Sequence, residues 1–149
     1  MAGCILTGNI MKKIILVGGC FDVLHFGHVR FLEQAKALGS TLVVLLESDE
    51  KVRAMKGDKR PIHTQEQRKI MLEALDCVDE VVILPELTTD AYYQTLVDRL
   101  KPSVIAVTEG DPILEIKQKQ AATIGARLVV IPKIHTPSTS QLAKLLGLE

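Results

Sequence analysis

Two histidines, His25 and His28, stand three residues apart in a glycine-bearing stretch that follows the apolar run 14–17 and precedes an amphipathic run. This order is typical of a strand, a turn and the start of a helix. Two imidazoles with Gly27 between them, beside the backbone N–H groups of a helix N-terminus, can hold and polarise an anion. The pattern indicates that the anion is a phosphate.

Two other roles for the histidines have to be weighed. Both rings can simply pack or cap a helix, because a glycine turn after a strand is frequent in α/β proteins. They can also bind a metal, but no nearby cysteine or aspartate completes a set of three or four ligands at a usual spacing. Phosphate chemistry is favoured because further basic and hydroxyl residues stand at the ends of later elements.

Those further residues are Lys56, Arg68, Ser138 and Thr139. A nucleoside triphosphate needs donors for its leaving pyrophosphate and an open path to its α-phosphorus. We expect the two histidines to donate to the α- and β-phosphates. Lys56 stands in a basic loop that can reach both substrates. The Arg68 guanidinium suits phosphate oxygens, and Ser138 and Thr139 at a helix start suit the β- and γ-phosphates.

Each of these residues also has a purely structural interpretation. Ser138 and Gln141 have the spacing of a capping box, and Lys56 can be a solvated surface lysine. Arg68 can pair with Glu66 or Glu73 on its own helix. Their shared position at the ends of elements favours the functional interpretation.

The elements that position these residues alternate along the chain. Continuous apolar runs predict buried strands at 12–17, 41–46, 81–84, 104–107 and 128–131. Helices are expected at about 27–38, 49–55, 65–75, 90–100, 113–124 and 141–146. The order predicts an α/β fold, a single-domain doubly wound, mostly parallel five-stranded sheet with helices on both faces. Ligands bind such sheets outside the carboxyl ends of the strands, where the histidine turn, Asp49, the Gly110-Asp111 turn and Ser138 would meet.

Length, charge and cysteine content limit the function further. A chain of 149 residues fits one domain, and 18 basic against 18 acidic residues give no overall field that favours nucleic acid or a membrane. Three scattered cysteines, Cys4, Cys20 and Cys77, suit a reducing compartment, and no apolar run approaches the length of a membrane span. We therefore expect a cytoplasmic protein, with an N-terminal extension at 1–11 and one domain at 12–149.

Five motifs together resemble the small cytidylyltransferase-like nucleotidyltransferases, from Lys13 to Leu146. They are Gly19-Cys20-Phe21-Asp22, His25-Phe26-Gly27-His28, Lys56-Gly57, Glu66-Gln67-Arg68 and Ser138-Thr139-Ser140. This group includes glycerol-3-phosphate cytidylyltransferase, the heptose-1-phosphate adenylyltransferase domain and archaeal FAD synthetase. The histidine motif alone also occurs in class I aminoacyl-tRNA synthetases, which are far longer.

The resemblance implies a Rossmann-like fold and transfer of a nucleoside monophosphate from CTP or ATP to a phosphorylated small molecule, such as glycerol 3-phosphate or a sugar phosphate. Pyrophosphate is released, Mg²⁺ assists, no covalent enzyme intermediate forms, and members are commonly homodimers. Cytidylyl transfer is slightly favoured over adenylyl transfer. The implied catalytic residues are His25, His28 and Lys56, and the implied nucleotide-binding residues are Cys20, Phe21, Arg68, Gly110, Asp111, Ser138 and Thr139.

The chain also departs from the family pattern. Cys20 stands where a threonine is usual, which removes a hydroxyl and keeps the backbone N–H. The segment Lys56–Pro61 resembles the heptose-phosphate branch most, yet Thr108-Glu109-Gly110-Asp111 replaces the usual Lys-Gly-Gly-Asp turn, so the branch stays open. A non-catalytic nucleotide-binding or sensor module is the alternative function, although it would not need His25, His28 and Lys56 together. A redox role for Cys20 lacks a resolving cysteine nearby.

Overall fold

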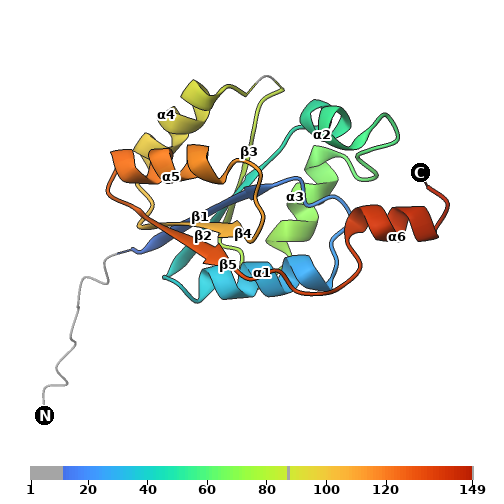
Figure 1. Ribbon diagram of the computed structural model, residues 1–149, viewed down its shortest axis with the longest axis horizontal. Helices are drawn as coiled ribbons and strands as arrows, with labels where there is room; N and C mark the ends of the chain where they lie inside the picture. The colour runs from blue at the N-terminus through green and yellow to red at the C-terminus, as the bar shows by residue number, and fades with distance from the viewer. Residues whose placement is uncertain (1–11, 87, 149) are drawn as a thin grey trace, which may run out of the picture.

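The computed structural model describes residues 12–86 and 88–148 (Figure 1). The strands in these ranges are β1 (Ile14–Gly19), β2 (Thr41–Leu46), β3 (Glu80–Ile83), β4 (Val104–Thr108) and β5 (Arg127–Ile131). The helices are α1 (Phe26–Lys36), α2 (Asp49–Lys56), α3 (Gln65–Glu73), α4 (Asp90–Leu100), α5 (Leu114–Thr123) and α6 (Thr139–Leu145). The predicted extension at 1–11 lies outside the described residues.

The predicted fold class is confirmed. The strands form a five-stranded sheet in the order β3-β2-β1-β4-β5, and every neighbouring pair is parallel. The predicted strands and helices are all present, although their ends differ by up to two residues. Helix α6 begins at Thr139 rather than at residue 141, because its N-cap is Ser138.

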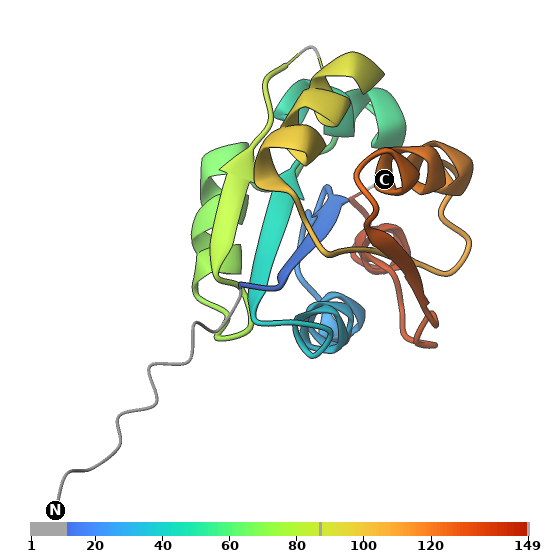
Figure 2. The same cartoon turned by 90° about the vertical axis from the view of Figure 1, so that its left-hand side faces the viewer.

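Two apolar layers hold the helices on opposite faces of the sheet (Figures 1 and 2). On one face, Leu32 of α1 and Leu72 of α3 pack against Ile15, Val17 and other side chains of the central strands. On the other face, the α4 and α5 residues Leu96, Val97 and Ala121 pack against Leu16, Val43 and Ile105. Both faces are covered, which explains why the central strands are apolar at consecutive positions.

The sheet opens between β1 and β4. Strand β1 pairs with β2 along its whole length, but it pairs with β4 only at Ile15 with Val104 and at Leu16 with Ile105. Chain order reverses at this point, since β2 and β3 lie on one side of β1 and β4 and β5 lie on the other. A doubly wound sheet binds its ligand at such a switch point.

Among the helices of the described ranges, none combines the length and the apolar character needed to cross a bilayer.

Candidate active site

The two histidines cap the start of α1 together. His25 is the N-cap residue, and its Nδ1 accepts a hydrogen bond from the Gly27 N–H at 3.0 Å. The His28 Nδ1 accepts in turn from the His25 N–H at 3.3 Å. The rings stack with their centroids 3.9 Å apart. A nitrogen that accepts from a backbone N–H carries no proton, so each neutral ring has its proton on Nε2.

Electrostatics keep both rings neutral. Burial, together with the nearby His25 and Lys56, lowers the pKa of His28 to about 4. Burial also lowers the pKa of His25. At neutral pH, the pair therefore presents two Nε2–H donors to the cavity that both rings line.

Two glycines of this loop leave room for neighbouring aromatic rings. A Cβ at Gly27 would lie 2.9 Å from the His25 ring and 2.9 Å from the Thr136 methyl carbon. A Cβ at Gly19 would lie 2.9 Å from the ring of Phe21, which meets His28 edge-on at a centroid distance of 5.4 Å. Phe21 itself has a φ of 46°, a left-handed conformation that few non-glycine residues adopt. The β1–α1 loop is therefore held in one unusual shape.

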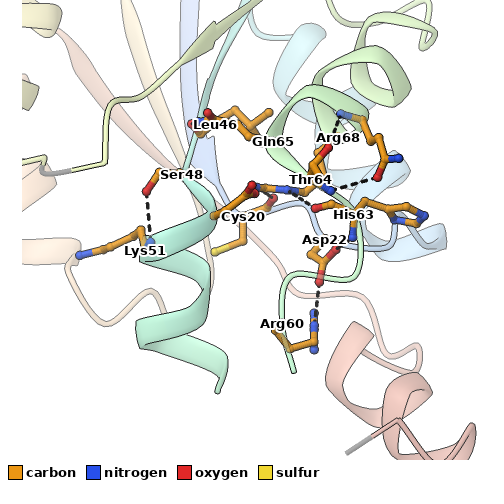
Figure 3. A network of polar contacts seen from close by, with 12 residues as sticks. Cys20, Asp22, Leu46, Ser48, Lys51, Arg60, His63, Thr64, Gln65 and Arg68 are labelled. Atoms are coloured by element: carbon orange, nitrogen blue, oxygen red, sulfur yellow. Dashed lines mark hydrogen bonds and ion pairs between the residues drawn. The ribbon is translucent and has the colours of Figure 1, made fainter. Parts of the chain in front are cut away.

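A buried carboxylate fixes this loop to the segment that follows Lys56 (Figure 3). Asp22 Oδ2 accepts from Arg60 Nε at 2.7 Å and from the Ile62 N–H at 2.8 Å, and its Oδ1 accepts from the His63 N–H at 3.0 Å. The side chains of Asp22 and Arg60 are 0% and 1% exposed. Burial opposes ionisation of Asp22, but these hydrogen bonds outweigh it and lower the pKa of the carboxyl group.

Arg68 also holds the β1–α1 loop in place. Its guanidinium is fully buried and donates to the carbonyl oxygens of His63 at 3.0 Å and Cys20 at 2.6 Å, and to Asp49 Oδ1 at 2.8 Å. The ion pair is therefore with Asp49 and not with the glutamates of its own helix. Arg68 does not line the cavity. The structure places Arg68 where it orients the Cys20 carbonyl. Its predicted contact with the nucleotide phosphates stays a prediction.

The cavity lies at the carboxyl ends of the strands and has a volume of about 680 Å³. Its size is within the range of small-molecule sites. Most predicted site residues line it together, namely Cys20, Phe21, His25, His28, Lys56, Gly110, Asp111 and Ser138. Lys56 is the exposed last residue of α2. Thr139 is the first residue of α6, and its side chain lies outside the described part of the structure.

The opposite wall comes from the loops after β4 and β5. Gly110 has a φ of 81°, and Asp111 pairs with Lys117 Nζ at 2.6 Å while it accepts from the Ile113 N–H at 2.9 Å. Ser138 Oγ accepts from the Gln141 N–H at 3.2 Å, so the predicted capping box is present. Its hydroxyl proton remains as a donor for a ligand.

The sequence did not single out three residues of the site, Asp22, Glu47 and Tyr93. Asp22 was part of a quoted motif, and Glu47 follows a predicted strand directly, so each had a positional signal. The Tyr93 hydroxyl donates to Glu47 Oε1, a contact across 46 positions that the sequence does not reveal. Burial and the Glu47 carboxylate raise the pKa of Tyr93.

Within residues 12–86 and 88–148, no group of three or more His, Cys, Asp or Glu side chains is arranged to hold a metal ion. Mg²⁺ prefers oxygen ligands and is commonly bound through substrate phosphates with one or two carboxylates. The residues present do not form a dedicated magnesium cage.

Residues 16–141 match the model of a protein family described as cytidylyltransferase-like. The chain belongs to this family. The family resemblance predicted from the motifs is thereby confirmed, and the match covers both the histidine loop and the start of α6.

Individual relatives agree with this assignment. The chain is 37% identical over 133 residues to the bifunctional protein HldE of Geobacter sulfurreducens, covering 88% of this chain and 26% of that protein. It is 40% identical over 133 residues to the protein of the same name from Wolinella succinogenes, covering 89% of this chain and 27% of that one. The chain thus spans about a quarter of the length of these curated relatives.

Solved structures share the fold. A lipopolysaccharide core biosynthesis protein from Thermoplasma volcanium superposes with a TM-score of 0.67 at 24% identity, covering 83% of this chain and 97% of that one. A pantoate-beta-alanine ligase from Francisella tularensis superposes with a TM-score of 0.63 at 17% identity, covering 89% of this chain and 65% of that one. At these identities, the likeness concerns the fold alone.

Proposed function

We propose that this chain transfers the nucleoside monophosphate of ATP or CTP to a phosphorylated small molecule and releases pyrophosphate. The observation that carries the proposal is the neutral pair of imidazoles. Each Nδ1 accepts from a backbone N–H, so each Nε2–H is left to donate into the cavity. A pure binding module would not need two such donors beside Lys56.

In the proposed reaction, a phosphate oxygen of the acceptor attacks the α-phosphorus of the triphosphate. A new P–O bond forms, and the bond between the α-phosphorus and the bridging oxygen breaks, so that pyrophosphate leaves with the electron pair. Negative charge grows on the leaving group, where fixed N–H donors stabilise the transition state more than the ground state. His25 and His28 supply these donors, and Lys56 neutralises charge on both substrates.

The choice between ATP and CTP is part of the proposal. The family resemblance slightly favoured cytidylyl transfer. The resemblance of Lys56–Pro61 to the heptose-1-phosphate adenylyltransferase branch and the similarity to HldE proteins support ATP and a sugar phosphate instead. We therefore propose ATP as the first donor to test and CTP as the second.

We also propose that Mg²⁺ assists the reaction, that the chain forms a homodimer and that it is located in the cytoplasm. Mg²⁺ would neutralise charge on the phosphates to which it binds. A homodimer is implied by the family resemblance alone, and sedimentation of the purified chain at several concentrations tests it.

The decisive assay measures pyrophosphate release with magnesium, using ATP, CTP, GTP and UTP against glycerol 3-phosphate, phosphocholine, phosphoethanolamine, sugar 1-phosphates and FMN. We expect release with one class of acceptor and a product whose mass equals acceptor plus nucleoside monophosphate minus water. Nucleotide binding without release for every acceptor would contradict the enzyme and support a nucleotide-binding module.

A further inference from the structure

Glu47 and Tyr93 form a polar pair in the cavity that the proposed mechanism does not use. Glu47 follows β2 directly, and Tyr93 lies on α4. The Tyr93 hydroxyl donates to Glu47 Oε1, and both side chains line the cavity. Among the described residues, nothing donates a hydrogen bond to the buried Glu47 Oε2.

A carboxylate with an unused buried oxygen is unfavourable for folding. A carboxylate can accept about four hydrogen bonds, and leaving a buried acceptor without a donor destabilises the folded state. The terminal torsion of glutamate is broad and nearly two-fold, so a modest rotation turns either oxygen toward the cavity. The unused capacity of Glu47 therefore points to a donor supplied by a ligand.

The position of the pair indicates which substrate supplies that donor. The Glu47 N–H donates to the Gly19 carbonyl oxygen at 3.1 Å, so the pair stands beside the loop that carries the histidines. Glu47 and Tyr93 line the same cavity as His28 and Lys56. In the proposed reaction, Lys56 contacts the phosphate of the acceptor, so the rest of the acceptor lies within the same cavity as Glu47.

A hydroxylated acceptor supplies neutral donors to the pair. The cavity lining carries both signs of charge, with Lys51 and Lys56 as well as Asp90 and Glu109. A hydroxyl group donates to a carboxylate without adding charge to this lining. The sugar phosphate favoured under the proposed function carries several such hydroxyl groups.

We propose that Glu47 and Tyr93 form the subsite that selects a polyhydroxylated acceptor, such as a sugar phosphate, by accepting hydrogen bonds from its hydroxyl groups. This inference rests on the proposed nucleotidyl transfer. Glu47 holds the hydroxyl, and Tyr93 is a positioning residue that orients the carboxylate.

The test compares a sugar phosphate with its deoxy analogues, each lacking one hydroxyl, in the native chain and in Glu47→Gln and Glu47→Ala. We expect the native chain to prefer the full sugar over one deoxy analogue by about 10- to 100-fold in kcat/KM for the acceptor. In Glu47→Ala, this preference should fall to within about two-fold, while the KM for the nucleotide stays unchanged. Glu47→Gln should keep part of the preference.

Three further variants separate the subsite from folding. Tyr93→Phe leaves the carboxylate in place and should raise the acceptor KM by about 3- to 10-fold, because Glu47 loses its orienting donor. The neighbours Tyr92 and Glu50 are exposed and lie off the cavity wall, so Tyr92→Phe and Glu50→Gln serve as matched controls without effect.

The outcomes distinguish this inference from the proposed function. Pyrophosphate release with phosphocholine or phosphoethanolamine, and not with hydroxylated acceptors, would overturn the subsite and leave nucleotidyl transfer intact. An equal loss for full and deoxy sugars in Glu47→Ala would also overturn the subsite. If no acceptor of the panel supports pyrophosphate release, both proposals are overturned.

Discussion

The two walls of the cavity are built differently. The β1–α1 wall rests on charged groups that are almost completely buried, since Asp22, Arg60 and Arg68 are each at most 2% exposed. The wall after β4 and β5 has a partly exposed ion pair, in which Asp111 is 13% exposed and Lys117 19%. Strand β1 is central in the sheet, whereas β5 is an edge strand.

This difference matches two tasks in the proposed reaction. Donors to a transition state are effective when their positions are fixed before the reaction, which requires rigid support. Loops that hold a nucleotide can adjust when the ligand arrives. Variants on the first wall should therefore affect rate and folding strongly, and variants on the second wall should affect mainly nucleotide affinity.

The largest expected effect is on turnover in His28→Ala. Removing one fixed donor to a developing oxyanion lowers kcat by about 10²- to 10³-fold. Steady-state pyrophosphate release measures the change, and the exposed His135→Ala is the matched control. If His28→Ala turns over within a few-fold of the native rate, the two walls do not differ in function as proposed.

The second expected effect is on stability and compares one aspartate from each wall. Asp22→Ala removes the buried carboxylate that accepts from Arg60, Ile62 and His63, so the free energy of unfolding should fall by about 3–5 kcal/mol. Asp111→Ala breaks a partly exposed pair and should cost about 1 kcal/mol. Urea denaturation measures both, with the exposed Asp58→Ala as control. Equal losses for the two aspartates would show that the walls are equally rigid.

Arg68→Ala separates support of the loop from direct nucleotide binding. The guanidinium donates to Cys20, His63 and Asp49, so its loss should lower the free energy of unfolding by about 3 kcal/mol and reduce kcat together. If Arg68→Ala leaves the free energy of unfolding unchanged and raises only the nucleotide KM, Arg68 has the phosphate-binding role that the sequence predicted.

The smallest expected effect is on the second wall, at Ser138. Ser138→Ala removes the N-cap of α6 and should cost about 1 kcal/mol or less, whereas Ser138→Thr keeps the cap. If the hydroxyl also binds phosphate, the alanine variant raises the nucleotide KM several-fold and the threonine variant does not. Equal nucleotide KM values in both variants would limit Ser138 to capping.

Local patterns in the sequence predicted the fold well. The apolar runs identified the strands because buried parallel strands are apolar on both faces. The capping box at Ser138 was predicted correctly because both partners lie within one helical turn. The histidine loop was recognised because its residue types and spacing are contiguous.

Long-range partners could not be predicted in the same way. Arg68 pairs with Asp49 across 19 positions, and Asp22 pairs with Arg60 across 38. Several carboxylates on or near the relevant helices were equally acceptable partners in sequence. Only the packing of α2 and α3 against the β1–α1 loop decides among them. The pairing of Glu47 with Tyr93 depends instead on how α4 packs at the end of β2.

The proposed mechanism requires both histidines to be neutral Nε2–H donors, and ring ¹⁵N NMR of the native chain over a pH series tests this directly. At pH 7, we expect both rings to be neutral with the proton on Nε2, and we expect His28 to titrate at about 4 rather than at 6.5. Between pH 6.5 and about pH 4, the unfolded chain binds more protons at His28 than the folded chain does. The free energy of unfolding should therefore fall as the pH is lowered through this range. A His28 that titrates near 6.5, or that carries its proton on Nδ1 at pH 7, would contradict the account.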